Sequence, residues 1–370
     1  MDLSPHASTR KLPILLAALF ALCLCLSSFG QLHASAHAHA PQPDLSTKSV
    51  FATAMNGDIY SFNAQTGAIR WKYQLLGSDA AASPVVSQGT LYVGTTAGEL
   101  LALNAKTGAL LWFYHTGGTI YGPPVIYNNM VYFGSQDGSV YALHAQNGTT
   151  VWQYKTGGPI DGTVAAANGT IFVGSEDTFL YALDSRMGNL HWRYQTGATV
   201  TPPAVHAGTV YAGSLDNNLY ALRATDGHLL WQYATRNGIA ALPTVAGSSV
   251  YVSSGDGSVY ALQKDTGQLQ WKTPLFREVY SSPTVSGHTV YVGASTWLYA
   301  LNASTGATRW STGLNGRFSD SKPAVAEPLV YMTSGFYLYA IDTQTGTIRW
   351  QYATPTRFHY RMDMGSPVVG

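Results

Sequence analysis

A tryptophan recurs every 39 to 41 residues along this sequence, from Trp71 to Trp350. A glycine stands four positions before each of these tryptophans, and an alanine or serine stands ten positions before it. The tryptophans are Trp71, Trp112, Trp152, Trp192, Trp231, Trp271, Trp310 and Trp350, and the glycines are Gly67, Gly108, Gly148, Gly188, Gly227, Gly267, Gly306 and Gly346. A fixed period of roughly 20 to 50 residues is typical of repeat proteins. The chain therefore contains eight copies of one unit.

One copy, residues 123–162, indicates what the unit folds into. Three pairs of turn-forming residues divide it into four short apolar runs: Asn128-Asn129, Asp137-Gly138 and Asn147-Gly148. Such pairs supply the positive φ angles of tight hairpins. The chain has 38 Gly, 17 Pro and 24 Tyr, a composition of turns joined by aromatic-rich strands. We therefore predict an all-β chain in which each copy is a four-stranded antiparallel blade of an eight-bladed β-propeller.

The two ends of the repeat region are complementary. The first copy begins at Ser49, already in its second strand, and lacks the Pro-Val segment that opens the other copies. A matching segment, Ser366-Pro367-Val368-Val369, stands at the other end of the chain. We predict that this segment forms the innermost strand of blade 1 and closes a ring over residues 49–370, because an open solenoid would need capping repeats instead.

Residues 1–36 are predicted to be a secretory signal peptide, and residues 37–48 a flexible linker. An uncleaved membrane anchor is the alternative, but the apolar stretch 12–26 is shorter than the roughly 20 residues that a spanning helix needs. Lipid attachment at Cys23 or Cys25 is a further alternative. We expect an exported protein, extracellular or periplasmic, with no transmembrane span in the mature chain.

Charge and cysteine content exclude several classes of protein. Only 11% of the residues are charged, against about 25% in an ordinary domain, and 20 Lys+Arg balance 19 Asp+Glu. This balance does not fit a nucleic-acid-binding protein. The only cysteines are Cys23 and Cys25, so we expect neither a disulfide nor a thiolate metal site after removal of the signal peptide.

The segment from Ala102 through Asn104, Thr107 and Gly108 to Trp112 resembles the pyrroloquinoline-quinone-like (PQQ-like) propeller repeat, also called the tryptophan-docking motif. The resemblance covers residues 49–370. It implies that each indole docks on the glycine-containing turn of the neighbouring blade, so we assign the eight tryptophans and eight glycines a structural role and no part in stacking on a quinone.

The resemblance leaves two functional classes open. Quinoprotein dehydrogenases of this family hold their cofactor against a disulfide of adjacent cysteines and bind calcium with acidic and amide side chains in the central funnel. Non-catalytic members include the lipoprotein subunit of the outer-membrane barrel-assembly machine and extracellular sensor propellers. Without cysteines or an evident acidic cluster, we predict a protein that is not an enzyme and has no cofactor.

Catalytic and metal-binding motifs give no competing prediction. No Gly-rich phosphate loop, nucleophile elbow or His-x-x-x-His pair stands out. Ser-x-Asp runs recur at the blade period, ending at Asp137, Asp177, Asp216 and Asp256. Their recurrence at every hairpin favours turn chemistry over calcium binding, and we predict no metal site.

One face of the predicted ring differs between blades. With the strands of a blade called A to D from the axis outward, the B–C turns and the D–A loops share a face. The loops that leave blades 5 to 8 carry arginine, and the B–C turns of blades 7 and 8 carry aromatic residues. These residues are Arg236, Arg277, Arg317, Arg361, Trp297, Phe336 and Tyr337. Arginine with exposed aromatics is typical of interface hot spots, although solvated loop charges and turn aromatics explain the same pattern.

Loop positions that lead into the inner strands are expected to line the mouth of the central channel, where a small ligand could bind. They are Tyr121, Asp161, Tyr280, Asp320 and Asp363. The predicted function is a protein-interaction or scaffold module at the cell envelope that docks a partner on the loop face of blades 5 to 8. The alternatives are a PQQ-dependent dehydrogenase, a propeller that binds a small ligand or sugar, and an outer-membrane barrel-assembly subunit. The oligomeric state is left open.

Overall fold

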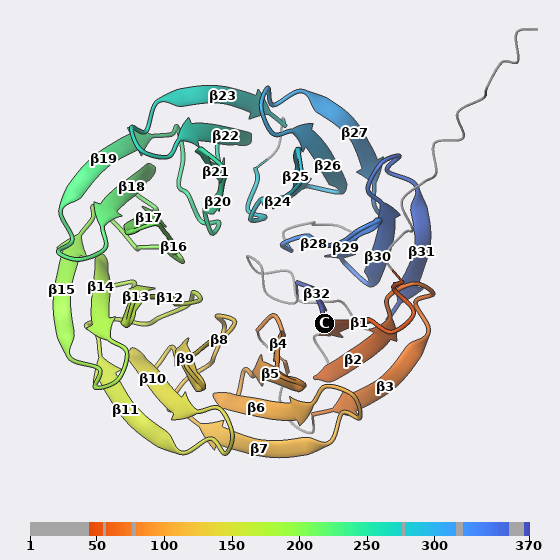
Figure 1. Cartoon of the computed structure of the whole chain (residues 1–370), viewed down its shortest axis with the longest axis horizontal. Helices are drawn as coiled ribbons and strands as arrows, with labels where there is room; N and C mark the ends of the chain where they lie inside the picture. The colour runs from red at the N-terminus through yellow and green to blue at the C-terminus, as the bar shows by residue number, and fades with distance from the viewer. Residues whose placement is uncertain are drawn as a thin grey trace, which may run out of the picture. The chain divides into compact units, whose positions relative to one another are not determined.

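The computed structural model describes residues 44–54, 57–75, 79–80, 82–275, 278–315, 321–354 and 366–370. Its 32 strands form eight four-stranded antiparallel sheets. The sheets are arranged as the blades of a ring around a central axis (Figure 1). The predicted signal peptide and most of the predicted linker lie outside the described residues. The all-β, eight-bladed propeller predicted from the repeat is confirmed.

Each blade has an innermost strand at the axis and an outermost strand at the rim of the ring (Figure 1). From the axis outward, blade 1 contains β32 (Val368–Val369), β1 (Ser49–Thr53), β2 (Asp58–Asn63) and β3 (Ile69–Gln74), and blade 2 contains β4 (Val85–Ser87), β5 (Thr90–Gly94), β6 (Glu99–Asn104) and β7 (Leu110–His115). In the same order, blade 3 contains β8 (Val125–Tyr127), β9 (Met130–Gly134), β10 (Ser139–His144) and β11 (Thr150–Lys155), and blade 4 contains β12 (Ala165–Ala167), β13 (Thr170–Gly174), β14 (Phe179–Asp184) and β15 (Leu190–Gln195). Blade 5 contains β16 (Ala204–His206), β17 (Thr209–Gly213), β18 (Asn218–Arg223) and β19 (Leu229–Ala234), and blade 6 contains β20 (Thr244–Ala246), β21 (Ser249–Ser254), β22 (Ser258–Gln263) and β23 (Leu269–Pro274). Blade 7 contains β24 (Thr284–Ser286), β25 (Thr289–Ala294), β26 (Trp297–Asn302) and β27 (Thr308–Gly313), and blade 8 contains β28 (Ala324–Ala326), β29 (Leu329–Ser334), β30 (Tyr337–Asp342) and β31 (Ile348–Ala353).

Local turn chemistry explains how each blade forms. In blade 3, Asn128 and Asn129 have φ angles of 50° and 62°, the conformation that a two-residue hairpin between β8 and β9 requires. At the C–D turn of blade 2, Oδ1 of Asn104 accepts hydrogen bonds from the backbone N–H groups of Lys106 and Thr107. The two middle strands of a blade are largely buried, whereas the outermost strand is largely exposed.

The hydrophobic core lies between neighbouring blades. One cluster joins Tyr132 and Val140 of blade 3 to Ile171 and Val173 of blade 4, all at most 1% exposed, and each of the eight clusters likewise joins adjacent blades. Because the blades share these clusters, no blade buries its apolar faces alone.

Each recurring tryptophan lies against the recurring glycine of the next blade. Gly108 has a φ angle of 76°, and an ideal Cβ built on it would lie 2.8 Å from Cε3 of Trp71. The Nε1 of the same tryptophan donates a hydrogen bond of 3.0 Å to the backbone oxygen of Ala105. The other seven tryptophans donate equivalent bonds of 2.9 to 3.1 Å. Glycine is required at this position because a side chain would occupy the space that the indole fills.

The C-terminal strand closes the ring. Val369 pairs with Val50 and Val368 pairs with Phe51, so β32 is the innermost strand of blade 1. Val368 packs in the cluster between blades 1 and 2, and Val369 in the cluster between blades 8 and 1. The predicted closure of the ring by this segment is confirmed.

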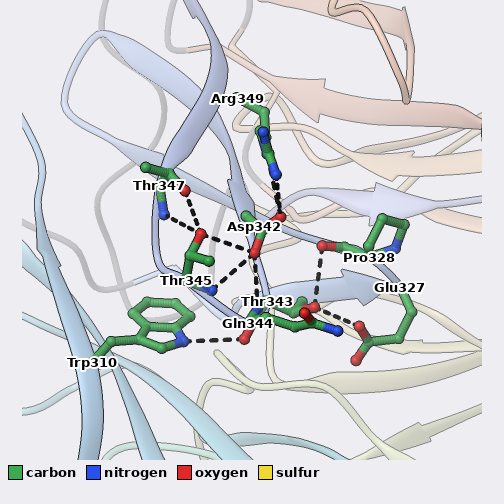
Figure 2. A network of polar contacts seen from close by, with 9 residues as sticks. All are labelled: Trp310, Glu327, Pro328, Asp342, Thr343, Gln344, Thr345, Thr347 and Arg349. Carbon is green, nitrogen blue, oxygen red and sulfur yellow. Dashed lines mark hydrogen bonds and ion pairs between the residues drawn. The ribbon is translucent and has the colours of Figure 1, made fainter. Parts of the chain in front are cut away.

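Polar contacts also join adjacent blades on the face that carries the A–B and C–D turns. Figure 2 shows the contact between blades 7 and 8, where Nε1 of Trp310 donates to the backbone oxygen of Thr343. The hydroxyl of Thr343 donates to the carboxylate of Glu327, whose other oxygen accepts a bond from Ser286 of blade 7. Asp342, which precedes Thr343 in the sequence, pairs with Arg349 at 2.7 Å (Figure 2).

Candidate functional site

The B–C turns and the D–A loops meet on one face of the ring, which we call the loop face. The backbone N–H of Gly117, in the loop that leaves blade 2, donates a hydrogen bond of 2.9 Å to the carboxylate of Asp137 in the B–C turn of blade 3. An ideal Cβ on Gly98, in the B–C turn of blade 2, would lie 2.6 Å from the backbone oxygen of Gly118. The two kinds of connection therefore contact each other both within a blade and between blades.

The Ser-x-Asp aspartates hold these loops, in a contact that we call the aspartate clasp. In blade 4, one carboxylate oxygen of Asp177 accepts bonds from the N–H of Gly157 and from the hydroxyl of Tyr181, at 2.7 and 2.6 Å. Its other oxygen accepts the N–H of Phe179. Equivalent clasps use Asp137, Asp216 and Asp256, the last with a longer loop contact of 3.4 Å from the N–H of Arg236. In blade 4 both carboxylate oxygens of Asp177 thus accept hydrogen bonds from the protein itself.

The clasps shift the pKa values of their members. Burial disfavours the charged form of Asp137, but the hydrogen bonds from Tyr141, Gly117 and Ser139 outweigh it, so the pKa of that carboxyl lies below its usual range. Burial and the bond to Asp177 raise the pKa of Tyr181 to about 12. Burial and the bond to Asp137 also raise the pKa of Tyr141, so the clasp of blade 3 combines an ionised carboxylate with a protonated phenol throughout the neutral range.

Blades 7 and 8 lack this aspartate. Their B–C turns are one residue shorter and carry Trp297 and Phe336, which are 42% and 40% exposed. The indole of Trp297 lies over Gly313 of the adjacent strand, within about 3.5 Å of where a Cβ would stand. The N–H of Asn315, in the loop that leaves blade 7, donates directly to the hydroxyl of Tyr339 of blade 8 at 2.8 Å. The loop face thus has clasped turns in blades 3 to 6 and exposed aromatic residues at the turns of blades 7 and 8.

The structure describes only two of the other residues proposed for partner binding. Tyr337 begins β30 and is partly exposed, and Arg236 is exposed at the loop that leaves blade 5. Arg277, Arg317 and Arg361 lie outside the described residues. The structure therefore describes the aromatic part of the predicted docking surface and one of its arginines.

A central cavity of about 660 Å³ lies at the inner strands. Its wall is mostly apolar and includes Pro124, Pro202 and Val325. Tyr121 and Asp161, two of the predicted channel-mouth residues, line it. Tyr280 is partly exposed and, among the residues that the structure describes, is not part of the wall. Asp320 and Asp363 lie outside the described residues.

The cavity wall has two charged residues that the sequence analysis missed, Glu176 and Lys322. Glu176 lies in the B–C turn of blade 4 beside Asp161, whose carboxylate also accepts a bond of 3.0 Å from the side chain of Gln136. Burial, followed by hydrogen bonding to Asp161, raises the pKa of Glu176. The sequence signal that could have indicated Glu176 is the middle residue of the Ser-x-Asp run. This residue differs between blades and is Gln136, Glu176 or Leu215 in blades 3 to 5.

Eight four-stranded blades around a central cavity define this protein as a β-propeller. The sequence profile of the PQQ-like propeller family described as outer membrane protein assembly factor BamB matches residues 55–162, 136–242 and 234–369, so the chain belongs to this family. No curated protein sequence matches the chain significantly.

Several solved structures share the fold. BamB from Moraxella catarrhalis is 23% identical, with a TM-score of 0.66 over 84% of this chain and 92% of that one. The computationally designed protein Ika8 is 18% identical, with a TM-score of 0.70 over 77% and 91% of the two chains. A europium-containing methanol dehydrogenase is 14% identical, with a TM-score of 0.66 over 77% and 81%. At these identities the likeness shows the fold alone.

The cavity wall does not match the quinone after which the fold is named. That cofactor carries carboxylate groups, whereas the described wall carries the carboxyl groups of Asp161 and Glu176 at blade 4 and a single cationic side chain, Lys322, beside blade 8. Within the described ranges, no three His, Cys, Asp or Glu side chains form a group that could hold a metal ion. The described wall does not fit the cofactor and calcium that the resemblance implied, and we derive no reaction from it.

Proposed function

We propose that this protein is a non-catalytic docking module at the cell envelope, which binds a protein partner on the loop face of blades 5 to 8. Membership of a family described as an outer membrane protein assembly factor supports a role in protein interaction at the envelope. The observation that carries the proposal is the pair of exposed aromatic residues, Trp297 and Phe336, at the B–C turns of blades 7 and 8, which replace the clasped turns of blades 3 to 6.

The chemistry of this surface favours a partner segment with both apolar and acidic residues. Trp297 and Phe336 offer apolar area that neighbouring strands leave about two-fifths exposed. Arg236 is exposed on the same face, and the loops leaving blades 6 to 8 add Arg277, Arg317 and Arg361 in the sequence. Aromatic and arginine residues contribute most of the binding energy in many interfaces. Carboxylates of the partner would pair with the arginines, and its apolar residues would contact Trp297 and Phe336.

The experiment is cross-linking from position 297 in the native envelope, followed by affinity measurements with the recovered partner. We expect Trp297→Ala with Phe336→Ala to weaken binding by about 2 kcal/mol or more. Phe113→Ala is the matched control, because Phe113 is 53% exposed on the outer strand of blade 2, away from the loop face. The proposal would be contradicted if the double variant weakened binding no more than Phe113→Ala does, or if it did not weaken binding at all.

The arginines have a separate test. Replacing Arg277, Arg317 and Arg361 by alanine should weaken binding more at low salt than at high salt, because screening already reduces their contribution at high ionic strength. Weakening that is independent of salt would argue against charge pairing with the partner.

Export is part of the same proposal. The apolar stretch before the linker is proposed to be a signal peptide that is removed at about residue 36, and N-terminal sequencing of the protein from cells tests this. Among the described residues, no helix has the length and apolar character needed to cross a bilayer. A first residue near position 37 in the envelope or extracellular fraction is the expected result, and an intact N-terminus would indicate an anchor instead.

A further inference from the structure

The central cavity combines three features that the docking function does not use. Its volume of about 660 Å³ lies within the range of roughly 300 to 1,000 Å³ typical of small-molecule sites. Prolines and valines at the starts of the inner strands give it an apolar wall. The charged residues among its described lining residues are Asp161, Glu176 and Lys322.

These charges lie on opposite sides of the axis. Glu176 belongs to blade 4 and Asp161 to the loop that enters it, and Lys322 lies two positions before the inner strand of blade 8. Blades 4 and 8 are four blades apart in a ring of eight, so they face each other across the centre (Figure 1). Among the described lining residues, the charge is therefore negative on one side of the cavity and positive on the other.

Neither side is neutralised by the described protein. Within the described residues, no cationic side chain pairs with Asp161 or Glu176, and no carboxylate pairs with Lys322. The backbone N–H of Lys322 is held by the hydroxyl of Ser366 at 2.7 Å, which anchors this residue at the closing strand. Asp161 and Lys322 are partly exposed and Glu176 is exposed, so each side chain is accessible to an oppositely charged group of a ligand that enters the cavity.

The inner strands add backbone groups to this wall. Each inner strand is the end strand of its sheet and pairs on one side only, with its unpaired edge toward the axis. Unpaired edges present N–H and C=O groups to an incoming peptide.

We propose that the central cavity binds a short apolar peptide with free termini, its ammonium group at Asp161 and Glu176 and its carboxylate at Lys322. A peptide is the simplest molecule that combines opposite terminal charges, an apolar body and backbone hydrogen-bonding groups. This site is separate from the proposed docking surface, and it does not depend on it.

The test is calorimetric titration of the full-length protein with trivaline, N-acetyl-trivaline and trivaline amide. We expect trivaline to bind and each cap to weaken binding by about tenfold or more. In Glu176→Gln, trivaline and N-acetyl-trivaline should bind with similar affinity, whereas amidation should still weaken binding. In Lys322→Met, trivaline and trivaline amide should bind with similar affinity, whereas acetylation should still weaken binding. Asp161→Asn replaces Glu176→Gln if that variant does not fold.

Two variants outside the cavity serve as controls. Glu278 and Lys106 are exposed and are not among its lining residues, so Glu278→Gln and Lys106→Met should leave all three affinities unchanged. The proposal would be overturned if trivaline did not bind at up to about 5 mM or if the three peptides bound equally. It would also be overturned if each cavity variant changed the effects of both caps equally. Each of these results leaves the docking proposal untouched, because that proposal is read from partner binding at Trp297.

Discussion

The indole Nε1 of Trp350 donates a hydrogen bond of 3.1 Å to the backbone oxygen of Ala64, 286 positions earlier in the chain. The same oxygen accepts the hydroxyl of Tyr331 at 2.9 Å. Blade 8 therefore docks on blade 1 in the same way that every other blade docks on its neighbour. The ring is closed both by this contact and by the pairing of β32 with β1.

The docking glycines should be more sensitive to substitution than other turn glycines. Gly108 and Gly89 have nearly equal positive φ angles, 76° and 77°, but only Gly108 lies against an indole, whereas an added Cβ at Gly89 meets no atom within 4 Å. Gly89→Ala should cost about 1 to 2 kcal/mol from backbone strain alone, and Gly108→Ala clearly more. Urea denaturation measures both, and equal losses would mean that the indole contact does not require glycine.

Removal of residues 366–370 should lower the melting temperature by about 5 °C or more. The truncation deletes β32 and the packing of Val368 and Val369 in two inter-blade clusters, and burial of one valine stabilises by about 1.5 kcal/mol or more. Thermal unfolding followed by circular dichroism is the measurement. Val151→Ala, at an exposed valine of β11, should leave the melting temperature nearly unchanged. A truncated protein as stable as the full chain would contradict closure by this strand.

Acid should weaken the contact around Asp342. Burial opposes ionisation of this carboxyl, but bonds from Arg349, Thr345 and Gln344 outweigh it and lower its pKa from 3.8 to about 2. Because the pKa is lower in the folded state, the stabilisation is present above pH 3.8 and is lost as the pH falls toward 2. The advantage of the wild type over Asp342→Asn should therefore shrink in melts between pH 5 and pH 2. An advantage that does not change with pH would contradict this assignment.

Loss of an aspartate clasp should loosen one loop without unfolding the ring. Asp177→Ala removes the acceptor of the Gly157 N–H, so the amide hydrogen of Gly157 should exchange at least about tenfold faster. Asp226→Ala is the control, since Asp226 lies in the exposed C–D turn of blade 5 and contacts no D–A loop among the residues described. Unchanged exchange at Gly157 would show that the clasp does not hold the loop.

The repeat was sufficient to predict the fold, whereas the cavity was only partly predictable. The spacing of the tryptophans and the segment beginning at Ser366 predicted the blades and their closure, because both depend on local turns and a fixed period. Glu176 and Lys322 were missed, because Glu176 is the variable middle residue of a Ser-x-Asp run and Lys322 belongs to no recurring motif. The two residues line one cavity only when eight inner strands converge on an axis. Trp297 was noticed because it departs from the period, but its contact with Gly313 depends on strand register.

The docking of every tryptophan on the next blade has a consequence for how the molecule unfolds. In a linear array of repeats the terminal units have one neighbour and can fray first, but in this ring blade 1 contacts both blade 2 and blade 8. No blade is terminal, so the loss of any one removes the docking partner of another. Unfolding should consequently be a single cooperative transition in which all eight blades melt together.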